Sequence, residues 1–192
     1  MEMPTERQWV HSFVARLDGD LEGIRGTRVR ATDSTRLAYA CEIQRYSADG
    51  TPEIETTRYE TDILIADHYK DGSWVPRLVI ECKLTGITTH DALTYSAKAA
   101  THRAVHPYLR YGFLAGNRKD YAIPPRLIRH GENFDFMLTW SGLKASPSEW
   151  RAFVALIKNE VKASRKLQTL LQENRSKGRR KFKQIHSPFQ AN

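Results

Sequence analysis

The fold is predicted most directly from residues 59–84, YETDILIADHYKDGSWVPRLVIECKL. It contains two runs rich in Ile, Leu and Val, which are typical of β-strands, and the turn residues Asp71 and Gly72 separate them. A two-residue turn predicts that Lys70 pairs with Ser73, so that paired positions sum to 143 throughout the hairpin. The stretch therefore predicts a hairpin with a fixed register.

This register sets Asp62 directly opposite Glu81. Lys83, two residues beyond Glu81, emerges on the same face of its strand. The opposite face is predicted to be a continuous apolar layer, made by the pairs Ile63–Ile80 and Ile65–Leu78. Register and hydrophobic pattern thus agree on an apolar layer opposite the face of Asp62 and Glu81.

Two facing carboxylates have Cβ atoms only about 5 Å apart and destabilise a sheet unless a cation neutralises them. Oxygen ligands at this separation suit Mg²⁺, for which we expect Mn²⁺ to substitute, with water and phosphate oxygens completing the coordination. Asp62 and Glu81 are the predicted metal ligands, and Lys83 would position the attacking water or stabilise charge. The alternative is a surface hairpin whose Asp and Lys are simply solvated.

The rest of the chain predicts helices and strands on either side of this hairpin. Helices are expected at residues 5–21, 90–106 and from Ser146 to about Leu171, and strands at residues 36–46, 59–68, 74–84, 111–115 and 134–140. In the middle helix, the packing face is predicted to be Leu93, Ala97, Ala100 and Ala104, with Tyr95, Lys98, His102 and His106 pointing away. This order predicts an α/β fold with a mixed central sheet flanked by helices and a long C-terminal helix.

Length and composition fit one domain, residues 1–174, followed by a basic tail, residues 175–192. Neither of the two cysteines belongs to a paired framework, and no stretch approaches the roughly 18 apolar residues of a membrane span. We therefore expect a cytoplasmic protein without a membrane partner.

The formal net charge of +8 favours polyanions, above all double-stranded DNA, as partners. The candidate DNA-binding residues are Lys98, His102, Arg103, Arg110, Arg118, Lys158 and Lys162. Lys158 and Lys162 form an exposed stripe with Arg165 and Lys166 in this prediction. Solvated faces are the competing interpretation of these side chains. Tyr108, Tyr111 and Asn117 are further candidates for base contacts, with core packing as their alternative.

The chain resembles the PD-(D/E)XK nuclease superfamily, which includes the restriction endonucleases. The resemblance rests on Asp62 followed, after a hairpin, by Glu81, Cys82 and Lys83, and on the order helix, three strands, helix, strand over about residues 5–115. It implies a restriction endonuclease-like core and a third acid, on the first helix, that acts as a metal ligand in many members. Glu6 is the preferred acid and Glu22 the alternative, although both also fit a simple surface charge.

The resemblance implies a Mg²⁺-dependent DNA endonuclease, an enzyme that hydrolyses phosphodiester bonds, and we expect a restriction enzyme of type II. Duplex cleavage by one compact site is most simply achieved by a homodimer. The alternatives are a structure-selective nuclease for DNA repair or Holliday junction resolution, and a catalytically inactive DNA-binding protein of the same fold.

Overall fold

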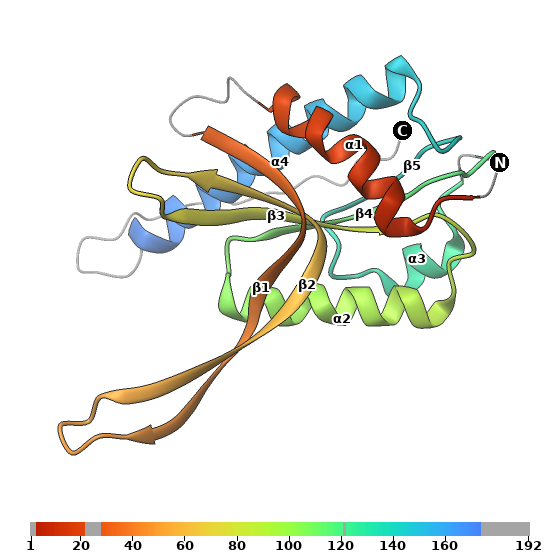
Figure 1. The fold of residues 1–192 in the computed structure, drawn as a ribbon. Helices are drawn as coiled ribbons and strands as arrows, with labels where there is room; N and C mark the ends of the chain where they lie inside the picture. The colour runs from red at the N-terminus through yellow and green to blue at the C-terminus, as the bar shows by residue number, and fades with distance from the viewer. Residues whose placement is uncertain (1–2, 22–27, 121, 174–192) are drawn as a thin grey trace, which may run out of the picture.

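The computed structural model describes residues 3–21, 28–120 and 122–173. The described chain forms a mixed α/β structure with one five-stranded sheet between two layers of helices (Figure 1). The expected mixed sheet with flanking helices and a long C-terminal helix is therefore confirmed. The predicted basic tail, residues 175–192, and Glu22 lie outside the described residues.

The strands follow one another across the sheet in chain order, with antiparallel pairing from the first to the third and parallel pairing from the third to the fifth. They are β1 (Arg28–Tyr46), β2 (Pro52–His68), β3 (Trp74–Lys83), β4 (Arg110–Ala115) and β5 (Phe136–Thr139). The central strand, β3, is buried on both faces along most of its length. This burial explains its nearly unbroken apolar sequence.

Two helices cover each face of the sheet (Figure 1). One face carries α1 (Glu6–Asp20) and α4 (Pro147–Glu173), and the other carries α2 (Thr89–Val105) and the short α3 (Pro125–His130). The predicted capping box of α2 is confirmed, because the Thr88 side chain accepts a hydrogen bond from Asp91 N and Asp91 binds Thr88 N in return. The sequence patterns did not predict α3, which is little more than one turn long. No helix within the described ranges is both long and apolar enough to cross a bilayer.

The main core lies between the sheet and the pair α1 and α4. The predicted apolar pairs Ile63–Ile80 and Ile65–Leu78 form its floor, and all four side chains are fully buried. Above them, aromatic rings from both helices and from the segment after β5 meet edge to face, namely Trp9, Phe13, Trp140 and Phe153. Such contacts add to the free energy gained by burying the rings.

The turn of the β2–β3 hairpin differs from the prediction of a two-residue loop. Tyr69 N donates to Ser73 O, and the loop between them is Lys70, Asp71 and Gly72, with Gly72 at φ +84°. The register near the turn is therefore shifted by one residue, and His68 pairs with Trp74. A bulge between Ile65 and Ala66 then restores the predicted register, so that Ile63 does lie opposite Ile80.

The buried face of α2 was predicted wrongly. Leu93 is 51% exposed, and the helix instead turns Ala92, Ser96, Ala99 and His102 toward the sheet. Alanines contribute little apolar area, so their spacing determines the rotation of a helix only weakly. Hydrogen bonds of buried polar groups decide it here, since His102 lies between the Tyr111 hydroxyl and the Leu37 carbonyl.

The outer halves of β1 and β2 form a two-stranded ribbon that projects from the body (Figure 1). The sequence prediction started β1 at residue 36 and β2 at residue 59, so it missed the early part of each strand. In β2 the missed segment, residues 52–58, is mostly polar and exposed, which leaves it without the apolar alternation that marks a half-buried strand.

Asp67 joins the sheet to α4 through two arginines. Its carboxylate accepts hydrogen bonds from Arg77 and Arg165, and the side chains of Asp67 and Arg77 are only 1% and 4% exposed. Burial raises the pKa of Asp67, but the two arginines outweigh it and hold this pKa below its ordinary value. The stabilisation by Asp67 is thus present at neutral pH and is lost as the pH falls through that lowered value.

We predict that Asp67→Asn lowers the free energy of unfolding by about 3–5 kcal/mol, because it leaves the Arg77 charge buried without a counterion. The matched control is Asp120→Asn, which breaks the ion pair of the exposed Asp120 with Arg118 and should cost less than about 1 kcal/mol. Urea denaturation at neutral pH measures both, and equal effects of the two substitutions would contradict this role of Asp67.

Candidate active site

Three of the predicted site residues meet on the α2 side of the sheet, where β2 and β3 part. Asp62 directly precedes Ile63, the first residue of β2 in chain order that pairs with β3. At Asp62 a side chain replaces the backbone pairing, because its carboxylate accepts a hydrogen bond from Cys82 N at 2.7 Å. Glu81 and Lys83 alternate with Cys82 along β3, and so they point to the face opposite the main core.

The backbone of β1 is irregular beside Asp62. The ladder between β1 and β2 pairs Asp33 with Ile63 and Thr35 with Thr61, but it leaves Ser34 and Asp62 unpaired between them. Ser34 has φ +51°, a conformation that costs free energy for a residue other than glycine. Backbone strain of this kind concentrates at functional sites.

Glu81 is a buried carboxylate with two polar partners. It is 1% exposed, Lys98 Nζ from α2 lies 3.1 Å from Oε1, and the Tyr111 hydroxyl on β4 donates to the same oxygen at 2.6 Å. His102 Nδ1 lies 3.3 Å from the Tyr111 hydroxyl and extends the network. The burial of the His102 ring lowers its pKa to about 4, so the ring is neutral at physiological pH.

Asp62 has a strongly shifted pKa. Burial and the nearby charge of Glu81 raise the pKa of Asp62 to about 7, against the opposing effects of the Cys82 amide and Lys98. The two acids are therefore close enough that the charge of one disfavours the charge of the other. A cation between them would remove this repulsion.

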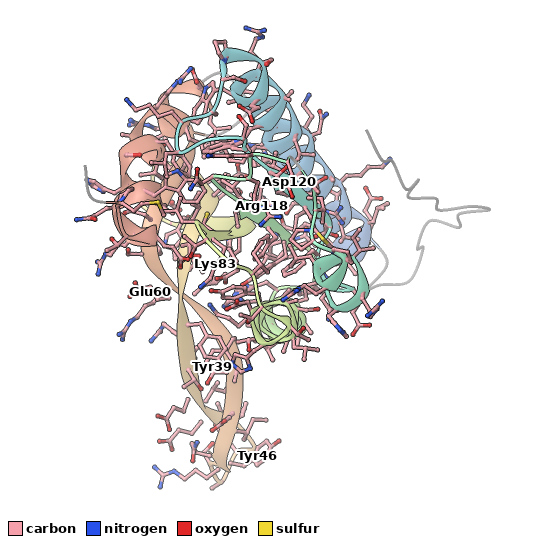
Figure 2. The ribbon with its side chains drawn as sticks, turned by 90° about the vertical axis from the view of Figure 1, so that its right-hand side faces the viewer. Tyr39, Tyr46, Glu60, Lys83, Arg118 and Asp120 are labelled. Carbon is pink, nitrogen blue, oxygen red and sulfur yellow. The ribbon has the colours of Figure 1, made fainter. Side chains whose placement is uncertain are left out.

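Lys83 connects the sheet to the first turns of two helices. Its Nζ lies 3.3 Å from Glu6 Oε1 on α1 and 3.7 Å from Asp91 Oδ1 on α2. Glu6 also accepts a hydrogen bond from Leu84 N. Figure 2 shows Lys83 on the body, near the base of the ribbon where Glu60 is labelled. The preferred helix acid, Glu6, is thus brought to the end of β3 that carries Lys83.

The donor set suits an open Mg²⁺ site better than a closed one. Among the residues that the structure describes, no group of three or more His, Cys, Asp or Glu side chains is arranged to hold a metal ion. Mg²⁺ often uses only one or two protein carboxylates and takes its other ligands from water and substrate phosphate. Asp62 and Glu81 fit that mode. The Glu81 carboxylate would then bind both the ion and Lys98, or its ion pair with Lys98 would open.

Several predicted DNA-binding residues have structural partners instead. The prediction for His102 is wrong, because the ring is fully buried, and Lys98 points toward Glu81 rather than away from the sheet. Arg103 pairs with Asp135, and Arg110 pairs with both Asp135 and Glu160. Tyr111, a candidate for base contacts, is also fully buried. The predictions for Lys98 and His102 failed because α2 turns a different face toward the sheet than expected.

The other predicted cations are Arg118, which follows β4, and two lysines of α4. Arg118 pairs with the neighbouring Asp120, as Figure 2 shows. Lys158 and Lys162 lie on α4, which covers the opposite face of the sheet. Arg165 was predicted to share their exposed stripe, but this is wrong, because it binds the buried Asp67.

Sequence reasoning missed the partners of Glu81. Tyr95, Lys98 and His102 were correctly grouped on one face of α2 but placed on the wrong side of the helix. The available signal was the unneutralised Glu81 itself, since a buried acid in a central strand needs a cation from a neighbouring element. Tyr95 belongs to the same surroundings, since Lys98 Nζ lies 5.5 Å from the centre of its ring, and burial and the charges of Asp62 and Glu81 raise the pKa of its hydroxyl.

The chain matches no protein-family model, and no curated protein is similar enough to count as a match. We therefore infer the function from the geometry of the site.

We predict that Lys98→Met lowers the free energy of unfolding by roughly 2–4 kcal/mol, because it leaves the Glu81 carboxylate buried without its cation. Adding Glu81→Gln should recover part of this loss, since the amide needs no counterion. Urea denaturation of the single and double variants measures the coupling, with the exposed Lys162→Met as the control. Strictly additive effects at Lys98 and Glu81 would contradict the pairing.

Asp62→Asn should change how stability depends on pH. Because the folded protein binds the Asp62 proton more tightly than the unfolded chain does, ionisation of Asp62 lowers stability as the pH rises from about 4 to about 7. The variant should match the wild type near pH 4 and exceed its free energy of unfolding by roughly 1–3 kcal/mol at pH 8. Parallel stability curves from pH 4 to 8, measured by urea denaturation, would refute the raised pKa.

Proposed function

We propose that the protein is a Mg²⁺-dependent DNA endonuclease of the restriction type, with a restriction endonuclease-like core of the PD-(D/E)XK kind. One observation carries the proposal: Asp62 and Glu81 lie on the same face of neighbouring strands, close enough for burial and mutual repulsion to raise the pKa of Asp62 to about 7. Lys83 stands on that face two residues further along β3. The order of helices and strands around these residues is consistent with that core.

Each residue has a defined task in the proposed reaction. Asp62 and Glu81 would hold Mg²⁺, or Mn²⁺ in its place, and the ion would act as a Lewis acid on the phosphate and on a bound water. Lys83 orients the nucleophilic water or stabilises negative charge on the phosphate. Glu6 Oε1 lies 3.3 Å from Lys83 Nζ and positions this ammonium group.

Lys98 and Tyr111 position Glu81 in this proposal. Lys98 balances the charge of Glu81 while the ion is absent, and the Tyr111 hydroxyl fixes the orientation of the carboxylate. Double-stranded DNA is the proposed substrate, because the net charge of +8 attracts a polyanion over a long range. Cleavage of both strands is most simply achieved by two such sites, which a homodimer would provide.

A DNA-binding protein of the same fold without hydrolytic activity is the second candidate. The observation that favours it is the ion pair between Lys98 and Glu81, which already neutralises one of the two metal ligands. In this case Lys98 would replace the ion permanently, and the protein would bind DNA equally well with and without Mg²⁺.

Incubation with supercoiled plasmid DNA tests the proposal. We expect cleavage with Mg²⁺ and none with EDTA, and a loss of roughly 100-fold or more in rate for Asp62→Ala, Glu81→Gln or Lys83→Ala. Glu60→Gln, at an exposed acid close to Asp62 in sequence, is the control and should cleave at the wild-type rate. Cleavage that survives Asp62→Ala would refute the assignment of the site.

Binding assays separate the two candidates. DNA binding without cleavage of plain, methylated or branched substrates, in either Mg²⁺ or Mn²⁺, would support the inactive protein. Mg²⁺ should also raise the melting temperature of the wild type but not that of Asp62→Ala. The absence of any such shift would count against the proposed metal ligands.

A further inference from the structure

The ribbon formed by β1 and β2 has an outer part that touches nothing else in the described chain. We call residues 41–55 the outer arm, and each of these residues is exposed. Figures 1 and 2 show the arm extending away from the body, with Tyr46 close to its tip. An isolated two-stranded ribbon is only marginally stable in water, so an arm of this kind gains stability from a partner surface.

The outer arm combines apolar and acidic side chains. Ile43 and Ile54 form a cross-strand pair and are 51% and 56% exposed, and Tyr46 is 64% exposed. Its charged residues are Glu42, Arg45, Asp49, Glu53 and Glu55. The arm therefore carries a net charge of −3, whereas the whole chain carries +8 and the remaining residues carry +11. This charge disfavours both DNA and a second arm as the partner.

A groove of complementary chemistry lies between α1 and α4. It has a volume of about 440 Å³, and apolar atoms of Trp150 and Val154 contribute to its lining. Three cations, Arg16, Arg151 and Lys158, share the groove with one acid, Asp20. The Arg16 guanidinium lies 4.2 Å from the centre of a Trp150 ring.

We propose that the outer arm of one copy docks into the α1–α4 groove of a second copy, so that two copies exchange arms in a symmetric dimer. Ile43 and Ile54 would cover the apolar part of the groove, while Glu53 and Glu55 would face its cations. The proposal extends the homodimer of the proposed function, but it does not depend on DNA hydrolysis.

This docking does not cover the side of the sheet that carries Asp62 and Glu81. The groove belongs to the helix layer of α1 and α4, whereas Asp62 and Glu81 face the α2 side of the sheet. A dimer built through the groove could therefore present two active sites at once. Lys158, expected from sequence to contact DNA, contacts the arm of the partner in this arrangement.

Sedimentation velocity over a range of concentrations of the full chain tests the docking. An arm-shortened variant, in which Asn-Gly replaces residues 43–54 and joins the paired Glu42 and Glu55, should be monomeric. Ile43→Ser combined with Ile54→Ser should raise the dimer dissociation constant at least about tenfold. Ile128→Ser, which removes an equally exposed isoleucine from α3, is the matched control and should leave it unchanged.

Charge exchange identifies the surface that the arm contacts. Glu53→Lys with Glu55→Lys should weaken the dimer, and so should Arg151→Glu with Lys158→Glu, whereas all four changes in one chain should restore it. Failure of this restoration would overturn the arm-to-groove contact. A monomeric wild type, or a dimer that persists after the arm is shortened, would overturn the proposal altogether.

A photo-crosslinker on the exposed Cys41 gives an independent readout, since Cys82 is buried. Crosslinks should map to α1 or α4 of the other copy, and crosslinks to another arm or to an unrelated basic protein would refute the docking. Plasmid cleavage by the arm-shortened variant separates this proposal from the enzymatic one. If the arm-shortened variant nicks the plasmid but no longer linearises it, hydrolysis survives without the dimer. If the wild type is a dimer but cleaves no DNA, the docking proposal stands and the enzymatic proposal fails.

Discussion

The neutralisation of buried Glu81 is the constraint on which the described structure depends most. A carboxylate that is 1% exposed in a central strand would be prohibitively costly without partners. Lys98 and Tyr111 provide them, and in doing so they fix the rotation of α2 and align β4 with β3. The candidate active site is thus also part of what holds the α2 layer to the sheet.

The opposite face of the sheet uses the same principle at another position. Asp67 is buried against Arg77 of β3 and Arg165 of α4, and this network ties the long helix to the sheet. The two buried acids differ in their consequences. Asp67 has two arginines and a lowered pKa, as expected of a structural ion pair, whereas the acids near β3's end repel each other and the pKa of Asp62 is raised. Because of this contrast, we propose a catalytic role for Asp62 and Glu81 and a structural role for Asp67.

Charge is also distributed unevenly along the chain. The outer arm carries a net charge of −3 and projects from the rest of the described structure, whereas the remaining residues of the chain carry +11. The remaining residues therefore favour a polyanion, and the arm disfavours one. Under our two proposals, DNA binding and self-association would use separate surfaces.

The sequence alone determined the strands around the site and the face on which its residues lie. The predicted hairpin register set Ile63 and Ile65 on one face and Asp62 with Glu81 on the other, and this division survives folding because a strand has a strict period of two. Even an error in the turn left the pairing of Ile63 with Ile80 correct, because a bulge compensated for it.

The tertiary structure was needed to show which side chains neutralise Glu81 and how far the ribbon extends. The face of α2 could not be read from alanine spacing, because contacts with distant Leu37 and Tyr111 set its rotation. The outer arm and the groove beside Trp150 likewise depend on elements far apart in the chain. Periodicity records which side chains share a face, but the partner of that face is set by packing between elements that local sequence does not encode.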